Sequence, residues 1–291
     1  MTSRHPLNVA SATRPDRLEL HCVPPQHLVF QRTVSLVGMG VSSSNMNDTC
    51  VIREVTKDVW TFSCPFSRFG ILPVGGRSTA VKLSNGDVWV MASTPLTEDT
   101  KAKLNELGPV RWIVGADAVH HLYLGDFKKE YPGAKLVAVD EAVKKKSKEN
   151  LEFHGVWGSD PPERQFGFEN DIKHCFFDGF ANRDTAFFHP ASRTLIVADL
   201  LFNLPCREQY SKTSSSGKVP IFGSLNPYMG IHKRFAWYLG ADKEAMTRDA
   251  KTVAGWDFDR IIPCHGDVIE KDGHKAWCEA YKWYLDADKK A

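Results

Sequence analysis

The sequence predicts an α/β protein built as an αββα sandwich, in which two β-sheets pack face to face with helices outside. Residues 98–139 alternate between helical and strand-like patterns, which is typical of layered α/β domains. Residues 80–91 read as a β-hairpin around Asn85-Gly86. A second group of strand-like segments begins near residue 172, so each half of the chain runs from strands to helices.

One domain is expected over residues 51–291, behind an irregular N-terminal arm at residues 1–50. The arm holds scattered Pro, Ser, Thr and Asn with weak periodicity, and residues 42–47 resemble a linker. The chain has 291 residues, of which 42% are hydrophobic, so it can bury a substantial core.

Strands in the first half follow from β-forming residues between turn signals. Asn85-Gly86 lies between two such runs, and Asn-Gly favours a type I′ turn because its central residues take positive φ. Thr97 is placed to cap a helix that stops before Gly108-Pro109. These signals predict strands at residues 55–62, 80–83, 88–91, 111–114 and 135–139, with helices at 98–107 and up to about residue 131.

The second half repeats this succession around a long loop. Residues 207–230 are polar and rich in Gly, Ser and Pro, a composition typical of a lid or binding loop. Trp277, Tyr281 and Tyr284 or Leu285 recur at helical spacing. We therefore expect strands at residues 172–177, 185–188, 194–198 and 260–263, and helices at 243–253 and 274–286.

Charge and hydropathy limit the classes of partner. The 37 basic and 35 acidic residues give a net charge of +2, and there is no basic stripe, which disfavours nucleic acid. The run Lys144 to Lys146 is interpreted as a solvated helix face. No run approaches the ~20 apolar residues of a membrane span. The expected partner is a small-molecule substrate or ligand, with the oligomeric state left open.

Cysteine usage bears on the compartment. The seven cysteines are odd in number and scattered, and no C-x-x-C occurs, which argues against a disulfide scaffold or zinc ribbon. This pattern indicates a reducing compartment and a cytoplasmic location. The Arg- and Ser-containing N-terminus keeps a mitochondrial location as the alternative.

Residues that can carry chemistry follow the predicted strands. His120-His121 comes after strand 111–114, Asp199 after strand 194–198, and His265 after strand 260–263. Binding sites collect at strand ends in layered α/β folds. Each residue alone has a structural explanation, such as a helix cap for Asp199. Their common placement predicts one shared site.

The segments RWIVGADAVHHL, DGFANRDTAFFHPASRTLIVADLLF and DRIIPCHGDVI occur in an order that resembles the metallo-β-lactamase superfamily. The resemblance covers about residues 51–285. More narrowly, FFHPASRTLIVAD is similar to a branch described only as a domain of unknown function. The resemblance implies the αββα fold and a metal centre.

The same resemblance implies an eroded metal centre. The family's first motif, H-x-H-x-D-H, places Ala116 and Ala118 at two histidine positions, and Phe180 falls at a third. The family's first metal would therefore lack its ligands. The set for the second metal maps onto four residues that can all ligate: His120, His121, Asp199 and His265.

The resemblance therefore implies a metal-assisted hydrolase-like protein acting on a small ester, thioester or lactone at a degenerate, mononuclear site. Three imidazoles and a carboxylate suit one divalent metal, zinc with iron as the alternative, or the site holds none. Asp199 is a candidate catalytic residue; Asp184 could be a substitute ligand or base, against a structural turn role. The alternative function is a non-catalytic binder or scaffold of the same fold without metal.

Overall fold

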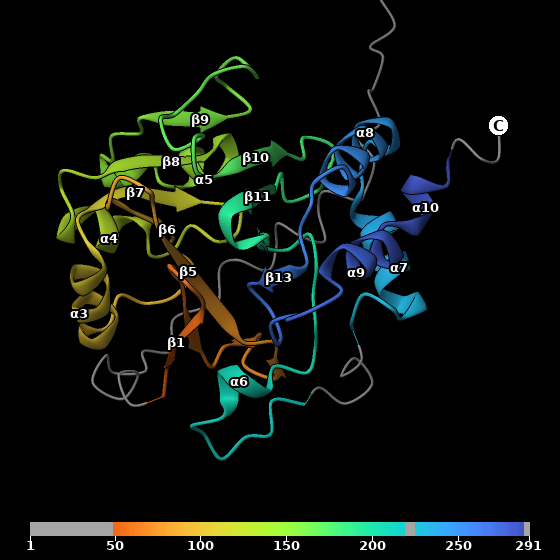
Figure 1. Cartoon of the computed structure of the whole chain (residues 1–291), viewed down its shortest axis with the longest axis horizontal. Helices are drawn as coiled ribbons and strands as arrows, with labels where there is room; N and C mark the ends of the chain where they lie inside the picture. Colours follow the sequence, from red (N-terminus) through yellow and green to blue (C-terminus); the bar gives the residue numbers. More distant parts are fainter. Residues whose placement is uncertain (1–48, 219–224, 288–291) are drawn as a thin grey trace, which may run out of the picture. The chain divides into compact units, whose positions relative to one another are not determined.

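A computed structural model describes residues 49–218 and 225–287. Nearly all of the predicted arm at residues 1–50 lies outside the described residues. The larger sheet has seven strands in the order β1-β2-β5-β6-β7-β8-β9 (Figure 1). Its first four strands are antiparallel, and β6 to β9 are parallel. The strands are β1 Val51–Thr56, β2 Val59–Cys64, β5 Gly76–Lys82, β6 Val88–Met91, β7 Val110–Gly115, β8 Lys135–Val139 and β9 Gly155–Trp157.

The smaller sheet has four strands in the order β10-β11-β12-β13. β10 to β12 form an antiparallel meander, and β13 pairs with β12 in parallel. A two-stranded ribbon, β3 Ser67–Arg68 and β4 Leu72–Pro73, stands apart from both sheets. The strands of the smaller sheet are β10 Lys173–Phe176, β11 Thr185–His189, β12 Thr194–Val197 and β13 Arg260–Pro263.

The two sheets share one apolar core, which makes the fold a sandwich. Buried residues of β6 and β7 belong to the same cluster as Phe187 of β11, Ile196 of β12 and Ile262 of β13. The rings of Trp89 and Phe187 meet across the sheets at 5.0 Å, edge to face. Burial of this apolar surface is the main force that holds the layers together.

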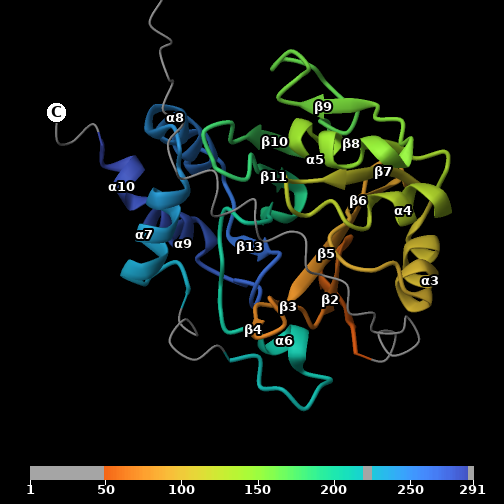
Figure 2. The same ribbon diagram turned by 180° about the vertical axis from the view of Figure 1, so that it is seen from behind.

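Helices cover the outer faces of the sandwich, so the predicted αββα class is confirmed. α4 and α5 contact β7 and β8, whereas α8 and α9 contact β10 and β13. Figures 1 and 2 show α3 to α5 beside the larger sheet and α7 to α10 beside the smaller one. The helices are α3 Glu98–Leu107, α4 Leu124–Glu130, α5 Asp140–Lys145, α6 Arg207–Tyr210, α7 Gly230–Leu239, α8 Lys243–Ala254, α9 Gly273–Ala280 and α10 Lys282–Leu285.

Local signals set several boundaries. Thr97 caps α3 by accepting from the N–H of Thr100, and the helix ends at Gly108, as predicted. β5 and β6 form the predicted hairpin. Its turn is not type I′, because Gly86 takes a positive φ of 88° and Asn85 does not.

Several expectations about local structure differ from the structure. The single strand predicted at residues 55–62 is divided between β1 and β2, because the chain turns at Asp58, whose φ is +65°. The segment 207–230, expected to be a loop, contains the short helix α6 in its described part. The helix α7 follows it and was not predicted. The closing helix, expected as one element over 274–286, is divided into α9 and α10 at Tyr281, whose φ is −100° and ψ 15°.

The lysine run at the end of α5 is the predicted solvated face only in part. Lys144 and Lys145 are exposed, although Lys145 donates to the carbonyl of Ala118 at 2.6 Å. Lys146 is 6% exposed and donates to the carbonyl of Leu122 at 2.9 Å. The two ammonium groups therefore hold the loop that follows β7, which carries His120.

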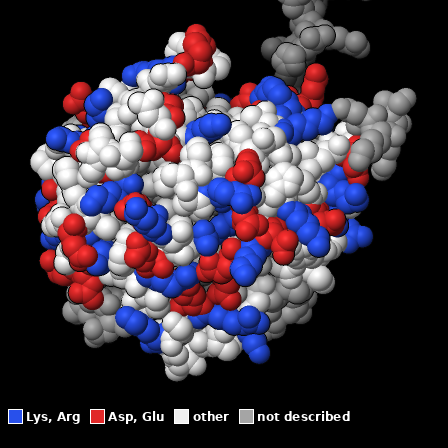
Figure 3. Space-filling model, in the orientation of Figure 1, with Lys and Arg blue, Asp and Glu red and all other residues white. Residues whose placement is uncertain are grey.

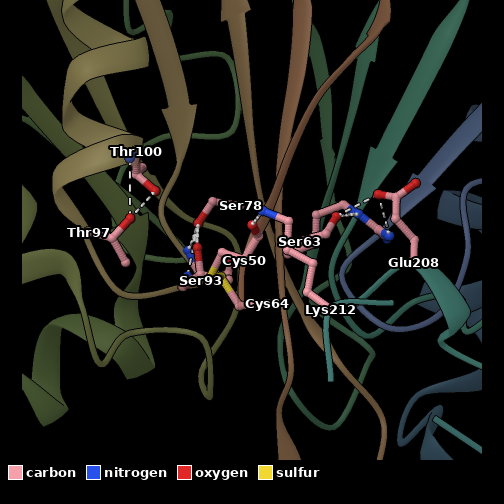
Figure 4. The surroundings of a disulfide bond; sticks show 11 residues. Cys50, Ser63, Cys64, Ser78, Ser93, Thr97, Thr100, Glu208 and Lys212 are labelled. Atoms are coloured by element: carbon pink, nitrogen blue, oxygen red, sulfur yellow. Dashed lines mark hydrogen bonds and ion pairs between the residues drawn. A yellow bond between two sulfur atoms is a disulfide. The ribbon is translucent and has the colours of Figure 1, made fainter. Parts of the chain in front are cut away.

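A disulfide joins Cys50 to Cys64, against the expectation of reduced cysteines (Figure 4). Val51 pairs with Ser63 in the β1–β2 register, so the two cysteines are the next cross-strand neighbours. The bond fastens the edge strand β1 to the sheet. Cys175, Cys206, Cys264 and Cys278 are free.

Both signs of charge are interspersed over the face shown in Figure 3. Among the described residues, no helix is both long and apolar enough to cross a membrane.

Candidate metal centre

Three of the predicted site residues converge although they are far apart in the sequence. His120 lies in the loop after β7, Asp199 follows β12, and His265 follows β13. One ligand atom from each lies within 4.8 Å of the others, and this is the one such group found in the described chain. The two Nε2 atoms of His120 and His265 are 3.1 Å apart, and Asp199 Oδ1 is 3.3 Å from His265 Nε2. We call these three residues the HDH cluster.

The side chain of His120 is held from behind by Asp117. The Asp117 carboxylate accepts from the N–H groups of Val119 and His120 and lies 2.9 Å from His120 Nδ1. This contact assigns the proton to Nδ1 and turns Nε2 towards the cluster. Burial alone would lower the pKa of His120, but the Asp117 charge, helped by Asp199, raises it well above its usual value.

His265 is oriented in the same way by backbone. Its Nδ1 lies 2.6 Å from the carbonyl oxygen of Gly75, so Nδ1 donates and Nε2 again faces the cluster. The ring stacks on Phe202 with centroids 4.9 Å apart, and its side chain is 4% exposed. Phe66 also stacks on the ring with centroids 6.4 Å apart, so the imidazole is fixed by a hydrogen bond and by aromatic contacts.

Asp199 presents one oxygen to the cluster and uses the other for anchoring. Oδ2 accepts from the Asn182 side-chain amide at 2.5 Å, whereas Oδ1 is buried without a hydrogen-bond partner. Burial would raise the pKa of Asp199, but the imidazoles of His120 and His265 lower it. A buried acceptor without a partner is costly, so its position calls for a bound cation or proton.

The donor set fits a divalent metal. Both Nδ1 atoms donate to other acceptors, so two Nε2 lone pairs and one carboxylate oxygen face each other at short range. Two acceptors 3.1 Å apart repel unless a cation or a proton lies between them. Two histidines and a carboxylate are a common set for catalytic zinc and for non-haem iron. With three protein ligands, a coordination position for water remains open.

His121 and Asp184 stand outside the HDH cluster, so the structure brings together three of the four predicted ligands and gives Asp184 the structural role that the sequence left as the alternative. Both ring nitrogens of His121 are buried without hydrogen-bond partners in the described structure. Burial, helped by Lys145 and Lys146, lowers its pKa to about 4. Asp184 is fully buried, and its oxygens accept from the N–H groups of residues 185, 199 and 200 at 2.7–2.9 Å. It thereby positions Asp199 and has no oxygen directed at the cluster.

The positions where the family's first metal would bind are apolar. Ala116, Ala118 and Phe180 are all buried. None of them has a side-chain donor atom, and no second group of ligating side chains occurs in the parts of the chain that the structure describes.

Sequence reasoning missed the residues that orient the ligands. Asp117 precedes His120 by three positions, a spacing that lets its carboxylate bind the loop N–H groups. That short-range pattern could have identified it. Asn182 binds Asp199 from 17 positions away, and no local signal indicates this contact.

Comparison with known sequences identifies the family. Residues 56–211 match the family described as "Domain of unknown function (DUF4336)". The chain belongs to this family. No curated protein matches the sequence.

Solved structures with the metallo-β-lactamase fold resemble this DUF4336 chain over most of its length. A metallo-β-lactamase from Pontibacter korlensis is 11% identical with a TM-score of 0.51, covering 81% of this chain and 99% of that one. The FIM-1 metallo-β-lactamase from Pseudomonas aeruginosa, in its mono-zinc form, is 15% identical with a TM-score of 0.51, covering 81% and 96%. The metal-soaked flavodiiron core of Flv1 from Synechocystis sp. PCC6803 is 11% identical with a TM-score of 0.56, covering 82% and 62%. The chain therefore has the metallo-β-lactamase fold, as the sequence resemblance implied.

Proposed function

We propose that this protein is a metal-assisted hydrolase with a mononuclear site formed by His120, Asp199 and His265. The observation that carries the proposal is the convergence of two imidazole Nε2 atoms and one carboxylate oxygen within 4.8 Å, with each side chain oriented by a partner behind it. Preorganised ligands with supporting hydrogen bonds are what a functional metal site requires.

When bound, a zinc or iron ion would polarise a carbonyl group or lower the pKa of a water molecule. The chain's own residues supply the rest. Asp117 and the Gly75 carbonyl hold the two imidazoles in the tautomer that leaves Nε2 free. Asp199 Oδ1, which has no hydrogen-bond partner, would be the third ligand atom and leave a coordination position for water.

A small substrate with an ester, thioester or lactone carbonyl suits this site. The side chains of Asp199 and His265 are 2% and 4% exposed, and that of His120 is 12% exposed. A cluster this buried favours a compact substrate that approaches beside His120. The DUF4336 chain's metallo-β-lactamase fold is compatible with carbonyl hydrolysis, although fold alone does not define a substrate.

The second candidate is a metal-free binder, and one observation favours it. Because the pKa of His120 is raised, a proton on Nε2 could bridge the two imidazoles as a hydrogen bond. In that state the cluster would be a closed polar network with no open position, and the protein would act through binding alone.

Elemental analysis of protein purified without a metal-binding tag separates the two candidates. The hydrolase proposal predicts close to one equivalent of zinc or iron per chain and hydrolysis of a generic ester or thioester panel. Both should be lost in Asp199→Asn, whereas His189→Ala, which alters a histidine outside the cluster, should retain them. Hydrolysis that persists after chelation and in Asp199→Asn would overturn the proposal.

A further inference from the structure

The backbone on both sides of His265 is bound by two buried side chains from distant parts of the chain. Arg77 Nη1 donates to the carbonyl oxygens of Pro263 and Gly266 at 2.6 and 2.7 Å. Gln209 donates to the carbonyl of Cys264 at 2.7 Å and accepts from the N–H of Gly266 at 3.1 Å. We call Arg77 and Gln209 the turn clamp.

The side chain of Gln209 forms hydrogen bonds with the backbone of this turn in the way that the backbone of a paired β-strand does. Its side-chain amide offers one donor and one acceptor to the peptide groups that flank His265, so neither group needs water. Gln209 is fully buried and belongs to α6. It also packs against Gly75, where a Cβ atom would lie 2.1 Å from Gln209 Oε1, and the Gly75 carbonyl accepts from His265 Nδ1. One side chain therefore contacts both backbone segments that fix the imidazole.

Arg77 is a buried cation with a prepared set of partners. It is fully buried, and burial lowers its pKa. Its Nε donates to Ser63 at 2.9 Å, and Glu208 Oε1 lies 3.5 Å from Nη2. Ser63 also donates to Glu208 at 2.7 Å, and Figure 4 shows the two side chains directed at each other. Arg53 adds a second ion pair to Glu208 at 2.8 Å.

This arrangement is poorly explained by stability alone. A buried ion pair often contributes no more than apolar residues of the same volume would. The guanidinium group is instead suited to geometry. Its Nη1 donates to both carbonyls, and Nε and Nη2 of the same rigid plane are held by Ser63 and Glu208, which fixes the direction of Nη1. Those two carbonyls belong to the residues just before and after the Cys264-His265 pair.

We propose that Arg77 and Gln209 are positioning residues that fix His265 and thereby set the affinity of the HDH cluster for its metal. This inference rests on the proposed metal site. It also gives α6 a specific role: the segment that follows residue 206 reaches the metal centre through Gln209. A displacement of α6 would release the turn and move one of the three ligands.

The test measures the Zn²⁺ dissociation constant of the full chain by competition with a chromophoric chelator. Gln209→Met removes both hydrogen bonds while keeping an unbranched side chain. Arg77→Lys keeps a buried cation but loses the Nε bond to Ser63 and the Nη2 contact to Glu208 that hold the donor nitrogen in place. Tyr284→Phe is the matched control, because it removes a buried hydrogen bond to Ala236 on the helical side of the domain.

We expect Gln209→Met to weaken Zn²⁺ binding by about 10- to 100-fold, as second-sphere changes do in other sites. Arg77→Lys should weaken it less, and Tyr284→Phe should leave it unchanged. The visible spectrum of the Co²⁺-loaded protein should shift in Gln209→Met and not in the control, which a general loss of stability would not produce.

If the wild type binds Zn²⁺ and both clamp variants bind it equally well, the positioning role is wrong while the metal site stands. If the wild type itself binds no Zn²⁺, the proposed function fails and the clamp proposal fails with it. Should Gln209→Met not fold, Arg77→Lys with the same two measurements decides the question.

Discussion

Replacement of His265 by alanine should abolish the response of the protein's stability to chelator. A ligand that binds only the folded state stabilises it by RT ln(1 + [L]/Kd), about 2.7–4.1 kcal/mol for a site 100- to 1,000-fold saturated. At about 2–4 °C per kcal/mol for a domain of this size, chelation should lower the wild-type melting temperature by about 5–15 °C. His265 is one of three donors, so the variant should bind little metal.

His265→Ala should also lower the free energy of unfolding of the metal-free protein. His265→Ala loses the hydrogen bond to Gly75 and the stacking on Phe202, about 1–3 kcal/mol. The expected order of melting temperatures is therefore loaded wild type, then chelated wild type, then the variant with or without chelator.

Thermal unfolding followed by circular dichroism, with and without chelator and with added Zn²⁺, measures this order. His189→Ala is the control, because this buried histidine bonds to Ser192 outside the HDH cluster, and it should respond to chelator as the wild type does. A wild type of known metal content whose melting temperature ignores both chelator and Zn²⁺ would refute the reasoning.

Three further predictions follow from other contacts. Asp184→Asn cannot accept from all the backbone N–H groups around Asp199, so urea unfolding should show a free energy of unfolding lower by about 1–3 kcal/mol, and metal affinity should fall. An unchanged free energy of unfolding and an unchanged metal affinity would contradict the positioning role. The Cys50–Cys64 disulfide closes a loop of 14 residues, so its reduction should lower the free energy of unfolding by about 3 kcal/mol. A dithiol titration should therefore lower the melting temperature of the wild type and leave that of the C50S/C64S variant unchanged. Burial raises the pKa of Glu169, but hydrogen bonds from His174 and backbone N–H groups lower it to about 2. The ionised carboxylate therefore contributes fully to the free energy of unfolding above about pH 4.5, and this contribution is lost as pH falls towards 2. The difference in that free energy between wild type and Glu169→Gln, roughly 1–2 kcal/mol at pH 7 after solvent screening, should close over the same pH window in pH-dependent unfolding.

Local patterns in the sequence were sufficient for most strands. Segments such as 135–139 and 194–198 are runs of β-branched and apolar residues between turn signals, and they form β8 and β12. Thr97 and Gly108 mark the ends of α3 because caps are local. Helix α7 escaped prediction because it has no side-chain N-cap and follows a polar segment.

The candidate site could be predicted only from the positions of its residues at the ends of predicted strands. His120, Asp199 and His265 each follow a strand, so their convergence could be expected. The adjacent histidine, His121, could not be excluded from the ligand set, because sequence does not show which of two neighbouring side chains faces the cluster. The structure directs only the first of them at it.

Long-range contacts account for the remaining differences. Lys146 was taken for a surface residue because a basic run is usually solvated, yet its ammonium group reaches a carbonyl 24 positions earlier. Cys50 and Cys64 became partners through the β1–β2 register, which their spacing alone does not reveal. Arg77 and Gln209 are bound to a turn that lies 55 or more positions away.

The wide spacing of the HDH cluster has a consequence for synthesis of the protein. His120 and His265 are 145 positions apart, and chains elongate at about 5–20 residues per second, so about 7–29 s separate their appearance. His265 follows β13, which pairs with β12, a strand 66 positions earlier in the chain. Pairing between strands this far apart in the sequence is slow. The nascent chain holds His120 alone until residue 199 is added, and two of the three ligands from there to residue 265. If the proposed site binds metal through all three ligands, the metal would therefore be acquired late, by a domain that has nearly finished folding, and a cell short of the metal would accumulate a folded but empty protein instead of an unfolded one.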